Sequence, residues 1–117
     1  MLWVWLLLRE TVVKTVLFVC FHNTGRSQMA EAMVNIFARE RGIDIRAISA
    51  GTVCGKSVNP VAIQAMNEIG ISMTGQKPKQ IMQWHVDNAD KIITMHCGVD
   101  PLNCPKRFLG NSVDWAI

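Results

Sequence analysis

Apolar runs alternate with amphipathic stretches along this chain, in the order typical of a sheet covered by helices. Continuous apolar or β-branched runs predict buried strands, and a 3.6-residue periodicity predicts the helices between them. The expected strands cover residues 15–20, 44–50 and 90–95, and the expected helices cover 27–41, 59–69 and 78–85. Because strands and helices alternate, we expect an α/β fold with a doubly wound parallel sheet.

The two longer expected helices have an inner face and clear ends. The first has an apolar stripe that we interpret as core rather than as a cofactor site, formed by Met29, Ala30, Met33, Val34 and Phe37. Gly42 follows that helix as a typical terminator. In the second helix, Asn59 is the expected cap, Pro60 occupies the first turn, and Gly70 ends it.

The chemistry is concentrated where the first strand ends. The chain must turn there from a strand into a helix, and successive backbone N–H groups in such a turn form a concave site for a tetrahedral anion. The helix dipole adds about half a positive charge, the fork of Arg26 can hold two oxygens, and Gly25 permits a tight turn. The same field favours a thiolate at Cys20, to which Ser27 can donate. The expected oxyanion-binding residues are Phe21, His22, Asn23, Thr24, Gly25, Arg26 and Ser27.

Each of these residues also has a simpler interpretation. Cys20 could be a structural cysteine, since cysteine is among the most buried residue types. Arg26 could be a solvated arginine, although a helix N-terminus disfavours a cation unless an anion is near. His22 could tune the anion field or face solvent. Asn23 could stabilise the loop through bonds from its side chain to the backbone, or be solvated.

This loop resembles the active-site loop of low-molecular-weight protein tyrosine phosphatases. The run Arg-Ser-Gln-Met-Ala-Glu at 26–31 resembles more closely that of their relatives, the thioredoxin-coupled arsenate reductases. Sequence motifs at 48–52, 58–66 and 69–75 are also similar to the family, and they extend the resemblance over about residues 14–117. The resemblance implies a four-stranded, flavodoxin-like sheet and a cytoplasmic enzyme in which Cys20 is the nucleophile.

Two cysteines after the third expected strand bear on which enzyme this is. In thioredoxin-coupled arsenate reductases, two resolving cysteines follow the corresponding strand with the spacing of Cys97 and Cys104, and a proline stands behind the second. The resemblance therefore implies a disulfide relay of Cys20, Cys97 and Cys104, with Arg26 as the oxyanion clamp. Cys54 matches no such position, and we assign it no catalytic role.

The spacing of Cys97 and Cys104 constrains that relay. In a continuous helix the two ends would lie roughly 10 Å apart, whereas a disulfide needs Cα atoms within about 7 Å. Gly98 and Pro101 disfavour a stable helix, so we expect a loop or a helix that can unravel. The alternatives are two unrelated buried thiols, or a metal site that also uses His96, although zinc sites usually have closer cysteine spacing.

The resemblance implies reduction of arsenate to arsenite. Cys20 would form a covalent adduct with arsenate, Cys97 would release arsenite by attacking Cys20, and Cys104 would pair with Cys97 for reduction by thioredoxin or another thiol reductant. A phosphatase would instead form a phosphocysteine and hydrolyse it with a general acid. Asp114 lies in a run that resembles the residues just before that acid, so we do not expect it to be the acid. A third hypothesis is an inactive module that only binds oxyanions.

Both ends depart from the family pattern. We expect a domain at 14–117, which is short at its C-terminal end and lacks the family's usual last helix, and an apolar extension at 1–13. The extension is too short for a bilayer span of about 20 residues and lacks the features of a signal peptide. It could reflect an upstream start codon, cover apolar surface, or form a homo-oligomer contact.

Length and charge fit a small anionic substrate. The 117 residues suffice for one hydrophobic core. The net charge of +3 is mild and unclustered, so it suits an oxyanion and gives no support for nucleic-acid binding. No membrane partner is expected.

A few polar residues outside the loop also have expected roles. Asn23 and Glu31 match positions that bind a structural potassium ion in some related arsenate reductases, so the resemblance implies a potassium site there. A solvated helix face explains Glu31 equally well, and no cofactor is required. We expect His85 and His96 to be structural, and residues 76–79 to form a solvated turn whose lysines could draw anions in.

Overall fold

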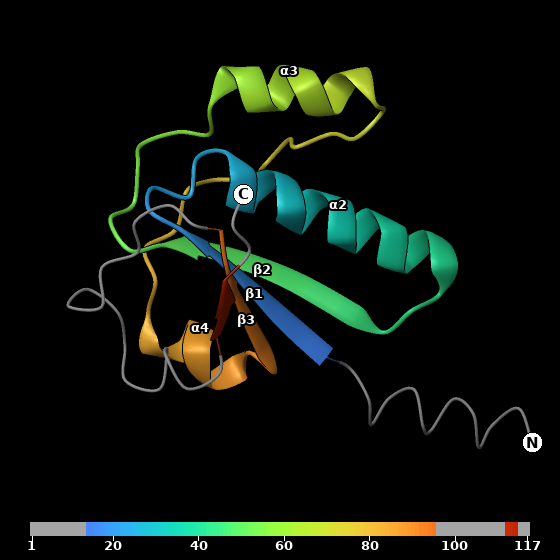
Figure 1. Ribbon diagram of the computed structural model, residues 1–117. Helices are drawn as coiled ribbons and strands as arrows, with labels where there is room; N and C mark the ends of the chain where they lie inside the picture. The colour runs from blue at the N-terminus through green and yellow to red at the C-terminus, as the bar shows by residue number, and fades with distance from the viewer. Residues whose placement is uncertain (1–13, 96–111, 115–117) are drawn as a thin grey trace, which may run out of the picture.

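The computed structural model describes residues 14–95 and 112–114 of the chain. Their helices and strands occur in the order expected of a βαβ protein (Figure 1). They are β1 (Lys14–Cys20), α2 (Arg26–Arg41), β2 (Ile45–Gly51), α3 (Pro60–Glu68), α4 (Gln83–Asn88), β3 (Lys91–Thr94) and β4 (Ser112–Asp114). No helix in these ranges is long and apolar enough to cross a membrane.

The sheet is parallel, and its strand order is β2-β1-β3-β4. β1 lies inside the sheet and pairs with β2 from Lys14↔Ile45 to Cys20↔Gly51. On its other side β1 pairs with β3, up to Val19↔Thr94. The chain leaves β1 toward β2 and later returns to the opposite side, so the carboxyl end of β1 is a topological switch point, where open α/β sheets bind ligands.

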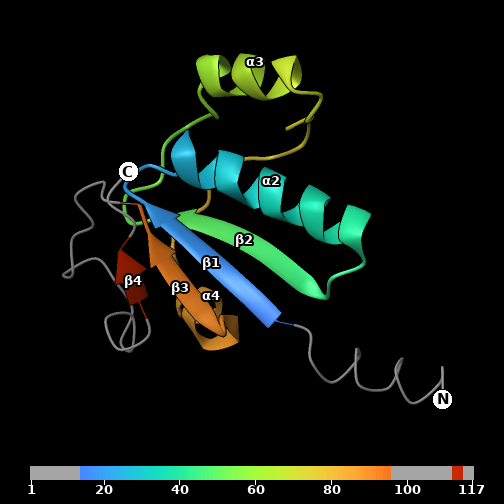
Figure 2. The ribbon, with the colours of Figure 1, turned by 45° about the vertical axis from the view of Figure 1, so that its right-hand side comes forward.

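Helices cover both faces of this sheet, which is the doubly wound arrangement expected from the sequence (Figure 2). Alternate residues of β1 enter different core clusters because strand side chains point alternately to the two faces. Leu17 and Val19 pack with Val86 of α4, whereas Phe18 packs with Ala30 of α2. A third cluster joins α2 to α3 and to the segment after it, so α3 forms an outer layer on α2.

Most expected boundaries are confirmed to within one or two residues, including Asn59 as the cap of α3 and Gly42, with φ of 63°, after α2. The helix expected at 78–85 is wrong, since the helix runs from Gln83 to Asn88. Residues just before it are extended instead: Gly51 donates to Lys79 O at 2.7 Å and accepts from Ile81 N at 2.8 Å. This pairing continues the edge of β2 and excludes a helix there.

Two further features differ from the expected pattern. The ring of Phe37 is 42% exposed rather than part of the core, and the Arg41 guanidinium lies 5.5 Å from its centroid. The hydrophobic pattern assigned no residues to a fourth strand, which the structure places at β4 beside β3. The extension at 1–13 lies outside the described residues, so the homo-oligomer contact stays a prediction.

Candidate active site

The loop between β1 and α2 encloses the cavity that the sequence predicted. The cavity measures about 370 Å³, and its lining residues are Cys20, Phe21, His22, Thr24, Gly25 and Arg26. Cys20 ends the central strand and is 9% exposed, whereas Arg26 is the first residue of α2 and is exposed. The structure therefore brings the thiol, the guanidinium and the helix N-terminus to one place.

Every backbone carbonyl from Cys20 to Thr24 is held on the outer side of this loop. Their donors, in order, are Thr52 N (3.2 Å), Val53 N (2.9 Å), Gly55 N (2.9 Å), Gln28 Nε2 (3.1 Å) and Asn59 N (2.7 Å). Because N–H and C=O point in opposite directions across a trans peptide, the N–H groups of residues 21–25 are turned toward the cavity. None of these five N–H groups donates to another atom of the described residues. They line the concave surface that the sequence predicted, and binding of an anion there stays a prediction.

Asn23 holds the middle of the loop. Its φ is 56°, in the left-handed region that asparagine adopts more readily than most residues. Its side chain is fully buried, and Oδ1 accepts from Gln28 Nε2 and from Lys79 N, both at 2.9 Å. Its Nδ2 donates to Ser27 Oγ at 2.8 Å. The Asn23 side chain thus holds the loop, but two of its partners are side chains and its one backbone partner, Lys79 N, lies outside the loop.

The buried Ser27 hydroxyl has a defined place in this network. It accepts from Asn23 Nδ2, so its own proton is available to a second group. Donation to the Cys20 thiolate stays a prediction.

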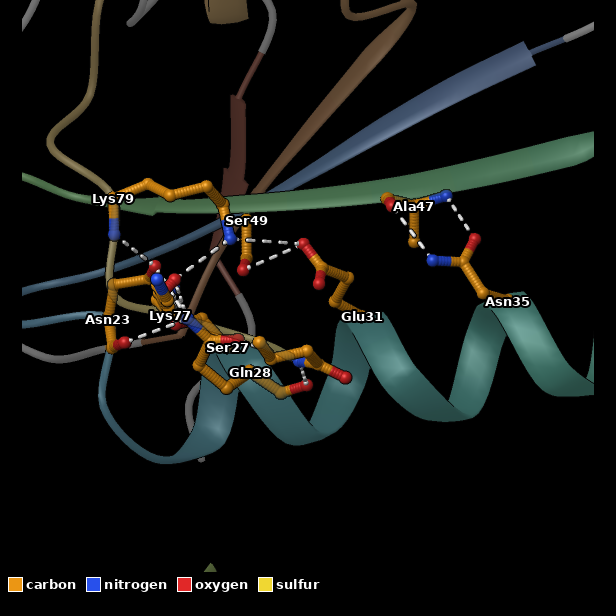
Figure 3. A network of polar contacts seen from close by, with 10 residues as sticks. Asn23, Ser27, Gln28, Glu31, Asn35, Ala47, Ser49, Lys77 and Lys79 are labelled. Carbon is orange, nitrogen blue, oxygen red and sulfur yellow. Dashed lines mark hydrogen bonds and ion pairs between the residues drawn. The ribbon is translucent and has the colours of Figure 1, made fainter. Parts of the chain in front are cut away.

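Gln28 is the structural residue of the site that sequence reasoning missed (Figure 3). It is fully buried. Its Nε2 donates to Asn23 and to Lys77 O at 2.8 Å, and its Oε1 accepts from Gln76 Nε2 at 2.6 Å. Gln28 thus joins the loop, the first turn of α2 and segment 76–79. A long amide within the first helical turn, next to an apolar stripe, was the only sequence feature that could have suggested this role.

Gly51 lets the loop approach β2 closely. A Cβ at this position would lie 2.7 Å from Phe21 O and 2.9 Å from both Asn23 N and His22 C, all of them backbone atoms. Contacts this short are essentially never found for a real Cβ. A side chain at residue 51 would therefore have to displace the loop at residues 20–25, which we call the anion loop.

A family model shows what kind of protein has this loop. Residues 15–107 match the model of the low molecular weight phosphotyrosine protein phosphatases. The chain belongs to that family.

Within the family, this chain is similar both to arsenate reductases and to phosphatases. The glutaredoxin arsenate reductase of Synechocystis is 34% identical over 108 residues, which cover 90% of this chain and 77% of that protein. The thioredoxin-dependent arsenate reductase of Corynebacterium glutamicum has a TM-score of 0.74 at 33% identity, covering 88% of this chain and 49% of that one. The low molecular weight protein tyrosine phosphatase of T. tengcongensis has a TM-score of 0.67 at 32% identity, covering 70% and 58%. The chain thus spans about half the length of the two structures.

Two further side chains, one in the anion loop and one in the segment after β2, make polar contacts with backbone carbonyls. His22 is exposed, and its Nδ1–H donates to Val53 O at 2.9 Å, which ties the loop to the segment after β2. Cys54 is a half-buried free thiol whose Sγ lies 3.1 Å from Gly55 O. That Cys54 has no catalytic role stays a prediction.

His85 lies on the other face of the sheet, in α4. It is buried, its Nδ1 accepts from Met82 N at 2.9 Å, and its ring stacks on Trp84 with centroids 3.7 Å apart. Burial lowers the pKa of His85 below its ordinary value of 6.5, and the positive charge of Lys79 lowers that pKa further. A neutral ring that caps α4 agrees with the structural role expected from the sequence.

The expected resolving cysteines, Cys97 and Cys104, lie outside the described residues, as does His96. The strand that leads to them is described, and it runs beside β1. Met95 N donates to Val19 O at 3.1 Å, one residue before Cys20. The described part of the chain at β3 therefore ends beside the residue that precedes the nucleophile.

Proposed function

We propose that this chain reduces arsenate to arsenite through Cys20. The observation that carries the proposal is the set of five inward N–H groups at residues 21–25, next to a cysteine and to Arg26 at a helix N-terminus. Such a site binds a tetrahedral oxyanion and stabilises a thiolate. The arsenate reductases among its relatives favour arsenate as that oxyanion.

In the proposed reaction, the Cys20 thiolate bonds to arsenic and an arsenate oxygen leaves as water. The Cys97 thiolate then attacks the Cys20 sulfur. The pair of electrons in the sulfur–arsenic bond passes to arsenic, which leaves as arsenite, and a Cys20–Cys97 disulfide forms. Attack of Cys104 on Cys97 regenerates Cys20 and leaves a Cys97–Cys104 disulfide. Thioredoxin or another dithiol reduces that disulfide, and the approach of Met95 to Val19 supports the first exchange.

Phosphatase activity is the second candidate, because the same loop and the matched family model favour it. It would use only the first half of the chemistry, with phosphate in place of arsenate and water as the second nucleophile. A binding module without turnover is the remaining hypothesis.

A paired assay separates these functions. Arsenite formation is measured with thioredoxin, thioredoxin reductase and NADPH, and hydrolysis of p-nitrophenyl phosphate is measured without them. We expect arsenite formation that is lost in Cys20→Ser and retained in Cys54→Ser, the matched control. Hydrolysis without arsenite formation would contradict the proposal in favour of a phosphatase, and phosphate binding without either reaction would indicate a binding module.

A further inference from the structure

The ammonium group of Lys79 belongs to the polar network beside the anion loop, and the backbone N–H of the same residue donates to Asn23 Oδ1. Lys79 Nζ is 3.5 Å from Glu31 Oε1 and donates to Lys77 O at 3.2 Å (Figure 3). The Glu31 side chain is 13% exposed and that of Lys79 35%. Segment 76–79 is therefore not the freely solvated turn that the sequence suggested.

Two of the oxygens expected to bind potassium, Asn23 Oδ1 and Glu31 Oε1, already have partners. Asn23 Oδ1 accepts from Gln28 Nε2 and from Lys79 N. Glu31 Oε1 accepts from Ser49 Oγ at 3.0 Å and faces Lys79 Nζ. A potassium ion would need these oxygens as ligands, because hard cations bind oxygen donors. It would also have to lie close to a positive charge that is part of the chain, so these residues do not fit the ion.

The position of Glu31 explains why a cation is needed there. Its carboxylate lies in the second turn of α2, close behind a site that must attract an anion and favour a thiolate. An unpaired negative charge there would oppose both. Lys79 neutralises this charge with its ammonium group, and its backbone N–H donates to Asn23 Oδ1. One residue therefore both balances the charge and holds the loop.

We propose that the Lys79 ammonium is the built-in cation of the anion loop, and that this loop works without an alkali metal ion. Lys79 is a positioning residue: it acts on bound oxyanion through Glu31 and Asn23 rather than by contact. The inference concerns the fold and its anion binding, so it does not depend on whether the chain turns over arsenate.

The test replaces the ammonium and compares salts. Lys79→Met keeps the backbone N–H and the stem of the side chain, and Lys77→Met removes the same charge from an exposed neighbour whose side chain makes no polar contact in the described part of the chain. Melting temperature and phosphate affinity are measured in KCl and in choline chloride at equal ionic strength. Cys20→Ser can serve as the common background, so that thiol oxidation does not interfere.

We expect the parent protein and Lys77→Met to give the same values in both salts. Lys79→Met should bind phosphate about two- to fivefold more weakly in choline chloride and recover in KCl, and Lys79→Arg should bind nearly as the parent does. In a Glu31→Gln background, Lys79→Met should have little further effect, because the charge that it balances is gone.

Two results would overturn the proposal. One is a parent protein whose melting temperature or phosphate affinity already depends on potassium, a measurement that requires no variant to fold. The other is a Lys79→Met protein that behaves like Lys77→Met. Neither readout involves turnover, so loss of this proposal and loss of the arsenate reductase proposal are distinguishable.

Discussion

Gly51→Ala tests whether the anion loop really rests on the end of β2. The added Cβ would meet Phe21 O at 2.7 Å, whereas an ordinary van der Waals contact lies at 3.4–4 Å. The loop backbone must therefore retreat by about 0.7 Å to restore such a contact. Overpacking of this kind lowers the free energy of unfolding by about 1–3 kcal/mol. Because misplacement by about 1 Å can reduce catalysis roughly 100-fold, we expect phosphate affinity to fall about tenfold.

The assay pairs urea unfolding with calorimetric titration of phosphate. Gly42→Ala is the matched control: Gly42 follows the far end of α2, with φ of 63° and no atom within 4 Å of its Cβ position. Alanine in that conformation costs about 1–2 kcal/mol, a similar loss of stability far from the loop. If Gly51→Ala binds phosphate as tightly as Gly42→Ala does, the loop does not depend on its close contact with β2.

Two further predictions concern buried polar groups. Gln28→Leu conserves volume but removes the Nε2 donor to Asn23 Oδ1 and Lys77 O, and it removes one of the two Gln28 acceptors of the Gln76 amide. We therefore expect urea unfolding to show a loss of about 1–3 kcal/mol together with weaker phosphate binding. A loss no larger than that of the exposed Gln64→Leu would contradict this. Because the pKa of His85 is lowered in the folded state, the unfolded chain binds the proton more readily than the folded one. The contribution of His85 to the free energy of unfolding should therefore be fully present above about pH 6.5 and should decrease as the pH falls below that value. His85→Gln should flatten that pH dependence, and an unchanged slope between about pH 5 and 7 would show that other groups cause it.

Local sequence was enough to predict the strand, the loop and the helix that form the site. The apolar run before Cys20, the Cys-x5-Arg-Ser spacing and the capping pair Asn59-Pro60 each act within a few residues. These features could therefore be predicted without knowledge of the fold. In the structure β1 ends at Cys20, α2 begins at Arg26, and Asn59 Oδ1 accepts from Val61 N at 2.9 Å.

The parts that escaped prediction depend on residues far apart in the chain. Gln28 contacts Lys77 and Gln76 across about fifty positions, and Lys79 reaches Asn23 and Glu31 in the same way. These contacts exist because residues 79–81 pair with the end of β2. The same pairing keeps these residues extended, so the short helix begins at Gln83 rather than at residue 78. Hydrophobic periodicity carries no information about such a pairing, since it reports only which face of one element is buried.

Peptide mapping of the fully reduced protein after one equivalent of arsenate, without any reductant, tests the proposed cysteine relay. We expect a Cys97–Cys104 disulfide to form only when arsenate is present, together with one equivalent of arsenite. We also expect Cys20→Ser to abolish both and Cys54→Ser to change neither. Cysteines that all stay reduced in an arsenate-treated protein that binds phosphate would contradict the claim that Cys20 initiates arsenate reduction.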